Sequence, residues 1–431
     1  MTEAPLLGEL MPWSVPGLRL GRGWVRSAHP DVLTARWQRL ADAPADQRSV
    51  LFGASRARTV DSAVAQLPGQ RTPSFRLARD PGPCPEPVRI RHGALDRLWL
   101  LPDQRVLDAA RPELWRVADA AQLFACVQPP GVGGPAVAFS AELPDGHRPG
   151  RAPGRIHPLY RRPGGREPNL APGLTRYLSA LLGRAVGPED LLAWTAAVTG
   201  VPDSPGAPDS PGTARPGEEV PVPLTGDPEL WAEGLALGHR LLRLHTFGRH
   251  VGDQHSGGQH VGDQQSGGQH APERFRLPDG RRPFVRERVT GFPEQLDHDA
   301  ESESLLLGTG RIAPVPRAAW AVGTAGVPVL SSWFAARSID PEARPGSLEA
   351  LGLSGWPQQF TAELIELATV LTLLAELRPQ QAALLRRLRG AGIGAAELRE
   401  AGVLPVPERA RRPASVLSHR EEGPEGQFAL L

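Results

Sequence analysis

The residues best suited to hold a metal lie in a short repeat rich in histidine and aspartate. Residues 250–259 and 260–269 are two near-identical copies of a ten-residue unit. With the residue that follows them, they carry His250, His255, His260, His270, Asp253 and Asp263. Imidazole and carboxylate groups are usual metal ligands, but the Gly, Ser and Gln between them cannot pack a core that would fix ligand geometry. We therefore expect a duplicated, unordered loop and no metal site.

The chain of 431 residues contains no lysine, so all 48 of its Lys-plus-Arg residues are arginines. A nucleotide-binding P-loop needs a lysine to reach the β- and γ-phosphates, and Schiff-base chemistry needs a lysine amine. Metal-dependent nucleases commonly use a lysine to polarise the attacked phosphate. These absences exclude a nucleotide-driven motor, a conventional nuclease and a Schiff-base enzyme. The arginine preference itself is what a GC-rich genome produces.

Other catalytic motifs are also missing from the sequence. The glycine turn Gly131–Gly134 lies between two strand-like segments, whereas a cofactor-binding turn lies between a strand and a helix, so it predicts a hairpin. Pro129-Pro130 is followed by a glycine and not by the aromatic residue that an amino-methyltransferase needs after its Pro-Pro pair. Neither G-x-S-x-G nor H-E-x-x-H occurs. We expect no catalytic residue, no cofactor and no enzymatic activity.

One segment, residues 148–166, concentrates positive charge without any acidic residue. It contains Arg148, Arg151, Arg155, His157, Tyr160, Arg161, Arg162 and Arg166. Interleaved Gly and Pro predict an exposed loop, from which arginine can contact phosphates or a guanine edge. The alternative is a solvated basic loop that meets the acidic stretch 294–303, and charge alone leaves both open. Because the net charge is only +1, any affinity for DNA must come from a local patch.

The hydrophobic pattern predicts a mixed α+β fold. Extended chain over 1–29 leads to a helix that opens at Pro30. Short strands are expected at Val88–Ile90, Leu98–Leu101, Leu123–Val127 and Ala136–Ala141. Helices are expected at Pro172–Gly183, Pro188–Gly200 and 228–245. A second β-rich part is expected at Arg282–Val289, Ser304–Leu307, Arg311–Val315 and Val327–Leu330, and two closing helices at Pro357–Leu377 and Pro379–Arg389.

Cysteine usage and hydropathy indicate the compartment. Cys84 and Cys126 stand far apart without a C-x-x-C pattern, which is typical of reduced thiols. No apolar stretch approaches 18 residues, and the N-terminus lacks the pattern of a signal peptide. We expect a cytoplasmic protein without a membrane partner.

Several stretches, in order, resemble the C-terminal specificity region of Type ISP restriction–modification enzymes, the single-polypeptide type I class. They are Gly154–Arg161 with Pro168–Leu170, Gly187–Trp194, Val220–Leu224, the helix ending at Leu244-His245, Gly310–Val315, Val322–Gly326 and Val329–Arg337. The resemblance covers about 85–405. The chain departs from the family where the arginine of its Pro-Arg-Ile-Pro strand, one glycine of its Gly-Gly signature and neighbouring lysines are missing.

The resemblance implies a non-catalytic, sequence-specific module for double-stranded DNA, of a stand-alone actinobacterial form. A methyltransferase or helicase–nuclease subunit would then act in trans. The DNA-contacting residues that we predict are Arg148, Arg151, Arg155, Tyr160, Arg161, Arg162, Arg166, Arg281, Arg282 and Arg337. For Trp333, Leu330 and Val329 core packing is favoured over base contact. The alternative for Tyr160 is a buried aromatic whose hydroxyl finds a partner, and for Arg337 an ion pair on the surface at a helix end. A different class of function also stays open, namely a protein-interaction or regulatory module that kept the fold and lost DNA binding.

The predicted organisation divides the chain in five. We expect an extended segment and helix over 1–70, the two parts of the specificity domain over 71–200 and 227–404, and a Pro/Gly-rich linker over 201–226. The second part would contain an unordered His/Gly repeat over 246–272, and residues 405–431 would form a flexible tail.

Overall fold

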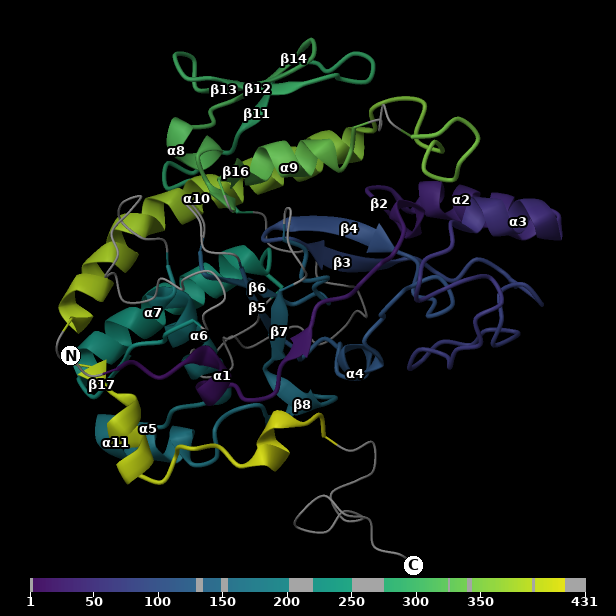
Figure 1. Cartoon of the computed structure of the whole chain (residues 1–431). Helices are drawn as coiled ribbons and strands as arrows, with labels where there is room; N and C mark the ends of the chain where they lie inside the picture. Colours follow the sequence, from purple (N-terminus) through teal and green to yellow (C-terminus); the bar gives the residue numbers. More distant parts are fainter. Residues whose placement is uncertain are drawn as a thin grey trace, which may run out of the picture.

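A computed structural model describes residues 3–128, 135–148, 154–200, 220–249, 275–324, 326–338, 343–389 and 392–414. The expected α+β class is confirmed, because small antiparallel sheets are combined with long helices (Figure 1). The predictions for the glycine turn 129–134 and for the repeat 250–269 lie outside the described residues.

The N-terminal segment contributes edge strands to two different sheets. Its elements are α1 (Leu7–Leu10), β1 (Val15–Pro16), the 3-10 turn η1 (Gly23–Val25), β2 (Arg26–Ser27), α2 (Pro30–Asp42) and α3 (Ala45–Phe52). The side chains of Trp13 and Trp24 are 2% and 1% exposed, so this segment belongs to the core. It crosses the face of the molecule between the N-terminus and α2 (Figure 1).

Two sheets build the first half of the body. One has the order β2–β4–β3, with β3 at Val88–His92 and β4 at Asp96–Leu100. The other has the order β1–β7–β5–β6, with β5 at Phe124–Val127, β6 at Val137–Ser140 and β7 at Arg155–Pro158. The expected pairing of the segments around 123–127 and 136–141 is confirmed, since Phe124 lies opposite Ser140 and Val127 opposite Val137.

Much of the segment predicted as an exposed basic loop is β-structure, so that expectation was wrong. After β7, strands β8 (Tyr160–Arg162) and β9 (Arg166–Pro168) form a hairpin. Gly164 and Gly165 make its turn with φ of 72° and 65°, a backbone region that glycine enters without steric cost. Ile156 and Leu159 are fully buried, and their burial draws this arginine-rich chain onto the body.

A helical layer packs beside these sheets and consists of α6 (Pro188–Val198), α7 (Pro228–His245) and α10 (Gln358–Leu388), whereas α5 (Leu174–Leu182) lies apart from it (Figure 1). The helices expected at Pro172–Gly183, Pro188–Gly200 and 228–245 are confirmed. Helices α6 and α7 approach each other so closely that a Cβ atom added at Gly238 would lie 1.9 Å from the Ala193 carbonyl oxygen. The rings of Trp194 and Trp231 stack across the same contact with centroids 4.6 Å apart.

Two expectations for the C-terminal half were wrong. Helix α10 runs unbroken through Pro379, where we expected two helices. Buried leucines lie on both sides of the proline, and the helix packs against α7 and α8 (Arg317–Trp320). That packing offsets the destabilisation of about 3 kcal/mol that a proline causes in the interior of a helix. Val329 and Leu330 begin helix α9 (Val329–Ala335) and are not in a strand, because Trp333 and Phe334 repeat their burial at helical spacing.

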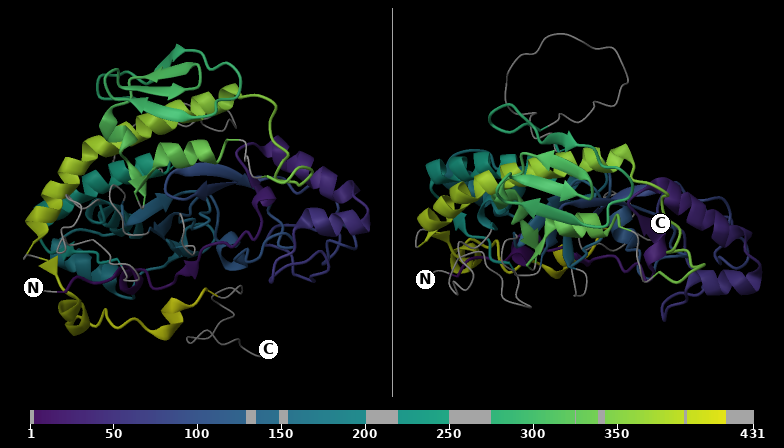
Figure 2. Two further views of the ribbon diagram at one scale, coloured as in Figure 1. Left: turned by 45° about the horizontal axis from the view of Figure 1, so that its top comes forward. Right: turned by 90° about the horizontal axis from the view of Figure 1, so that it is seen from above.

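The remaining sheet forms a separate layer over the long helix. Its order is β11–β14–β13–β12, with β11 at Phe284–Glu287, β12 at Leu296–Asp299, β13 at Ser304–Leu307 and β14 at Gly310–Ala313. It lies on the outer side of α10 (Figure 2). Smaller elements are α4 (Pro112–Trp115), β10 (Leu224–Thr225), β15 (Gly323–Thr324), β16 (Val327–Pro328), β17 (Gly392–Ile393), α11 (Ala395–Glu400) and the 3-10 turn η3 (Glu408–Arg411). None of the helices described is long and apolar enough to cross a membrane.

Candidate nucleic-acid interface

The two arginines of strand β8 are held by a single carboxylate. Arg161 forms an ion pair with Glu167, and Arg162 donates to the other oxygen of the same carboxylate at 2.8 Å. Arg161 also donates to the carbonyl oxygens of Arg409 (3.1 Å) and Arg412 (2.6 Å), which ties the C-terminal segment to the hairpin. Glu167, and not the acidic stretch 294–303, therefore balances this pair. Because Arg162 is only 8% exposed, it does not suit a DNA contact.

Tyr160 and Arg166 belong to the same hairpin but differ in exposure. The hydroxyl of Tyr160 donates to Glu189 at 3.3 Å, and burial, reinforced by that carboxylate, raises the pKa of Tyr160 to about 12. The ring is buried, so it serves packing and does not meet the prediction of a DNA contact. Arg166 is exposed, and its Nε donates to the Pro163 carbonyl oxygen at 3.0 Å.

Arg337 lies in the core. Its side chain is 1% exposed and contacts Asp96 and Glu363, each at 3.0 Å. Its guanidinium also lies 3.9 Å from the ring centroid of Trp333. DNA cannot reach this position, so we correct the prediction for Arg337 and assign it a structural role. The burial of Trp333, Leu330 and Val329 agrees with the packing role that the sequence favoured for them.

The other predicted arginines do not form one patch. Arg148 is half-buried and close to Gly154, Arg155 is exposed, and Arg151 lies outside the described residues. Arg281 is exposed and 3.7 Å from Asp279, while its neighbour Arg282 is half-buried. Arg281 and Arg282 precede β11, which lies on the opposite side of the molecule from β8 (Figure 1). The structure therefore does not bring the two predicted groups together.

A different row of arginines follows the N-terminal segment, and we call Arg19, Arg111 and Arg155 the arginine strip. Strands β1 and β7 place Pro16 opposite Arg155, whose side chain donates to the hydroxyl (2.7 Å) and carbonyl oxygen (2.9 Å) of Ser14. Arg111 donates to the Gly17 carbonyl oxygen at 3.4 Å.

Arg19 completes this strip, because its backbone pairs with Ala109 and its side chain is exposed. The contacts follow chain positions 14–19, which span about 16 Å when extended. None of the three guanidinium groups forms an ion pair with a carboxylate in the part of the chain that the structure describes.

Beyond Arg19 the strip reaches a pair of stacked histidines. The rings of His92 and His147 lie with centroids 4.2 Å apart, and the Nδ1 atom of His92 is 2.6 Å from the Asp145 carboxylate. Although burial opposes its ionisation, the charge and hydrogen bond of His92 hold the pKa of Asp145 at about 2. Burial, with the nearby charge of His92, lowers the pKa of His147 to about 4, so that ring is neutral at physiological pH.

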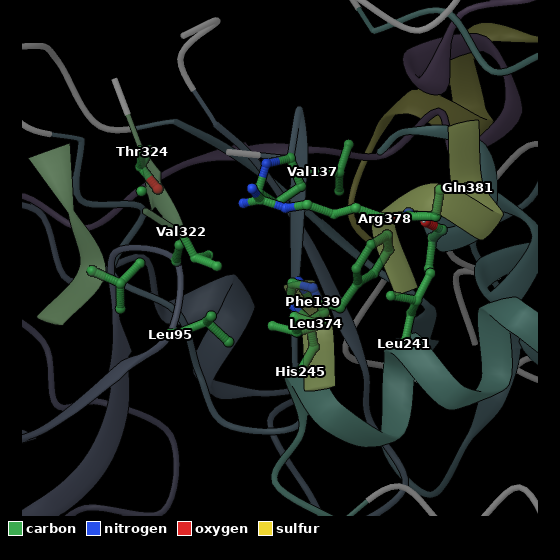
Figure 3. Close-up of a pocket in the computed structure, with 15 residues that line it drawn as sticks. Leu95, Val137, Phe139, Leu241, His245, Val322, Thr324, Leu374, Arg378 and Gln381 are labelled. Atoms are coloured by element: carbon green, nitrogen blue, oxygen red, sulfur yellow. Dashed lines mark hydrogen bonds between the residues drawn. The ribbon is translucent and has the colours of Figure 1, made fainter. Parts of the chain in front are cut away.

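A further cavity, between β6, α7 and α10, is too small for a ligand. It is enclosed by Leu95, Val137, Phe139 and Thr324, and Arg378 extends into it from α10 (Figure 3). Its volume of about 30 Å³ holds little more than a water molecule.

The two cysteines and the possible metal ligands were expected to have no chemical role. Burial raises the pKa of Cys84 to about 11 and that of Cys126 to about 12, so both thiols are protonated and poorly nucleophilic. Within the described ranges, no group of three or more His, Cys, Asp or Glu side chains is placed to hold a metal ion.

The family model of the Type ISP C-terminal specificity domain matches residues 9–203 and 218–367, which is most of the chain. The chain belongs to this family. No curated protein matches it.

Two solved structures share the fold of this specificity domain. One is the cryo-EM structure of a DrdV–DNA complex, with 13% identity and a TM-score of 0.53, covering 87% of this chain and 35% of that one. The other is the ATP-dependent Type ISP restriction–modification enzyme LlaBIII bound to DNA, with 11% identity and a TM-score of 0.54. That match covers 89% of this chain and 23% of LlaBIII. The chain thus spans about a third or less of the length of these proteins.

The sequence pattern of this specificity domain did not reveal its arginine strip. Arg19 lies in a segment that we expected to precede the domain, although the family match begins at residue 9. His92 follows Arg89 and Arg91, whereas His147 lies 55 residues further along the chain, so no local sequence pattern joins the two histidines or links them to Arg111. The only available signal was the absence of acidic residues over 4–30 apart from Glu9, which concentrates Arg19, Arg22 and Arg26 there.

Proposed function

We propose that this specificity domain recognises a sequence in double-stranded DNA and performs no chemistry itself. The observation that carries the proposal is the family match over 9–203 and 218–367, which includes every residue of the arginine strip. The DNA named in the titles of the DrdV and LlaBIII structures supports the same partner. A methyltransferase or helicase–nuclease subunit acting in trans would supply catalysis.

The arginine strip is the contact surface that fits this function. Its three arginines have no acidic partner among the described residues, so their charge is available to phosphates. The exposed Arg166 is a further candidate contact, and Arg148 and Arg151 stay predictions from the sequence. Arg281 and Arg282 belong to a second, separate region. Contacts of this kind compensate for a net charge of only +1, because they act at short range.

Salt-dependent binding to a random-sequence duplex tests the proposal. Fluorescence anisotropy between about 50 and 200 mM salt should give an affinity that falls steeply, with a slope near −0.9 per contacted phosphate. Arg19→Ala and Arg155→Ala should each make this slope less steep by about 1. The matched control is Arg399→Ala, an exposed arginine on α11.

Selection from a pool of random duplexes then tests sequence specificity, because a recognition module should enrich a common sequence over several rounds. A chain that binds no duplex at low salt, alone or with a methyltransferase or helicase–nuclease added, would disprove the DNA function. That result would leave the protein-interaction or regulatory module as the explanation of the fold.

A further inference from the structure

Two cavities meet at Arg26 and His147, next to the arginine strip. A cleft of about 330 Å³ lies between the β3–β4 turn, β15 and α9, and a second hollow of about 370 Å³ lies along residues 18–23. Both are lined by Arg26 and His147, and the second also by Arg19. The strip therefore continues into a concave site, which we call the histidine cleft.

The carboxylates that line these cavities are already engaged. Asp96 binds Arg337 and its side chain is 6% exposed, while Asp145 binds His92 and its side chain is 3% exposed. In the described part of the chain no other acidic residue lines either cavity. An anion in the cleft would thus meet cations and neutral donors instead of an open carboxylate.

The Arg26 guanidinium has N–H groups that donate no hydrogen bond within the described residues. Its side-chain hydrogen-bond contacts within the described ranges are both with the His92 ring, from Nη1 to Nδ1 at 3.2 Å and to Nε2 at 3.5 Å. Because Nδ1 carries the hydrogen of the 2.6 Å bond to Asp145, it cannot accept from Arg26. Most of the five N–H groups of this guanidinium are therefore unused.

The walls of the cleft supply further polar groups. The ring nitrogens of His147 have no hydrogen-bond partner among the described residues. The backbone N–H of His147 donates to the Asp145 carboxylate at 2.8 Å. The hydroxyl oxygen of Thr324 is buried on the cleft wall without a partner in the described structure. A buried hydroxyl without a partner costs free energy, so the site is incomplete as it stands.

We propose that the histidine cleft binds a phosphodiester group of the DNA backbone, with Arg26 and His147 donating to its oxygens. This inference rests on the proposed DNA function and assigns one contact within it. The concave shape favours a phosphate over a base edge, because phosphates project from the duplex whereas base edges are recessed in its grooves. Asp145 and His92 act as positioning residues that hold the stacked ring of His147 against the cleft.

The test compares Arg26→Gln and His147→Gln with the Arg399→Ala control in the salt titration of duplex binding. Arg26→Gln should lower the slope of log affinity against log salt by about 0.9, the loss of one phosphate contact. His147→Gln should weaken binding several-fold, and Arg399→Ala should leave both slope and affinity unchanged. Circular dichroism confirms that each variant is folded.

A second measurement does not depend on the variants. In NMR spectra of the wild-type chain, the His147 ring resonances should shift when a short duplex is added. If Arg26→Gln does not fold, this shift decides the question. A shift with inorganic phosphate but none with duplex would overturn the proposal in favour of a site for free anions.

The outcomes separate this inference from the function on which it rests. Wild-type protein that does not bind duplex contradicts the proposed function as a whole. Wild-type protein that binds, with an unchanged slope in Arg26→Gln and an unchanged affinity in His147→Gln, contradicts only the cleft.

Discussion

The stacking of His92 on His147 joins two segments that are distant in sequence at one site. His92 ends strand β3, and His147 follows the Asp145 turn that binds the His92 ring. The centroid separation of 4.2 Å means that a positive charge on one ring raises the cost of charging the other. The pair is therefore sensitive to any anion that enters the histidine cleft, and this sensitivity gives the first prediction.

DNA affinity should rise as the pH falls from 8 toward 5. The groups that face His147 are His92, Asp145 and Arg26, and burial together with the positive neighbours lowers its pKa to about 4 in the free chain. A bound phosphate favours the protonated ring, so the pKa must be higher in the complex. Affinity then increases as the pH drops through that higher pKa, and it levels off below about 4. NMR titration of His147 with and without duplex measures both values, and His147→Gln should remove its share of the pH dependence.

Acid should destabilise the fold before the carboxylates titrate. Burial lowers the pKa of His157 from 6.5 to about 4 and that of His245 to about 3. The unfolded chain binds protons at these histidines at a higher pH than the folded chain does. Their contribution to the free energy of unfolding is therefore fully present above pH 6.5 and is lost as the pH falls toward the pKa values of the folded chain. Because a shift of one pKa unit corresponds to about 1.36 kcal/mol, His157 alone accounts for about 3 kcal/mol of the free energy of unfolding. Urea denaturation at several pH values measures this loss, which should be smaller in His157→Gln.

Removing Arg337 should destabilise the protein, because it binds two buried carboxylates, one of which also lines the histidine cleft. Arg337→Met leaves Asp96 buried without its cation, while Glu363 keeps its pair with Arg89, and the loss of the buried pair costs about 3–5 kcal/mol. The control is Arg387→Ala on the exposed pair with Glu233, which should cost less than about 1 kcal/mol. Equal stabilities of the two variants would contradict the structural role of Arg337.

The close approach of α6 and α7 should not tolerate a single added methyl group. In Gly238→Ala the new Cβ would lie 1.9 Å from the Ala193 carbonyl oxygen, which is backbone and cannot move aside. We expect a loss of about 3 kcal/mol or more, or no folded protein, from this overpacking. Gly352→Ala, where no atom lies within 4 Å of the new Cβ, should change the unfolding free energy by less than about 1 kcal/mol in the same denaturation experiment.

The sequence by itself determined the local elements whose signals are complete within a few residues. Helix α7 is an example, because Asp227 caps it, Pro228 starts it and its leucines recur at helical spacing. The sequence also predicted the pairing of β5 with β6 and the family resemblance, since both depend on contiguous stretches of the chain. Pro379 misled the prediction because the packing that keeps α10 whole comes from α7 and α8.

Only the tertiary structure decided which arginines are available to a ligand. Arg161, Arg162 and Arg337 look as suitable as Arg19 in the sequence, yet Glu167 and Asp96 occupy them in the fold. The availability of an arginine depends on whether a carboxylate lies within about 4 Å, and that carboxylate comes from any part of the chain. The arginine strip and the histidine cleft arise from the pairing of β1 with β7 and the placement of Arg26 beside His92. No periodicity in the sequence encodes such long-range contacts.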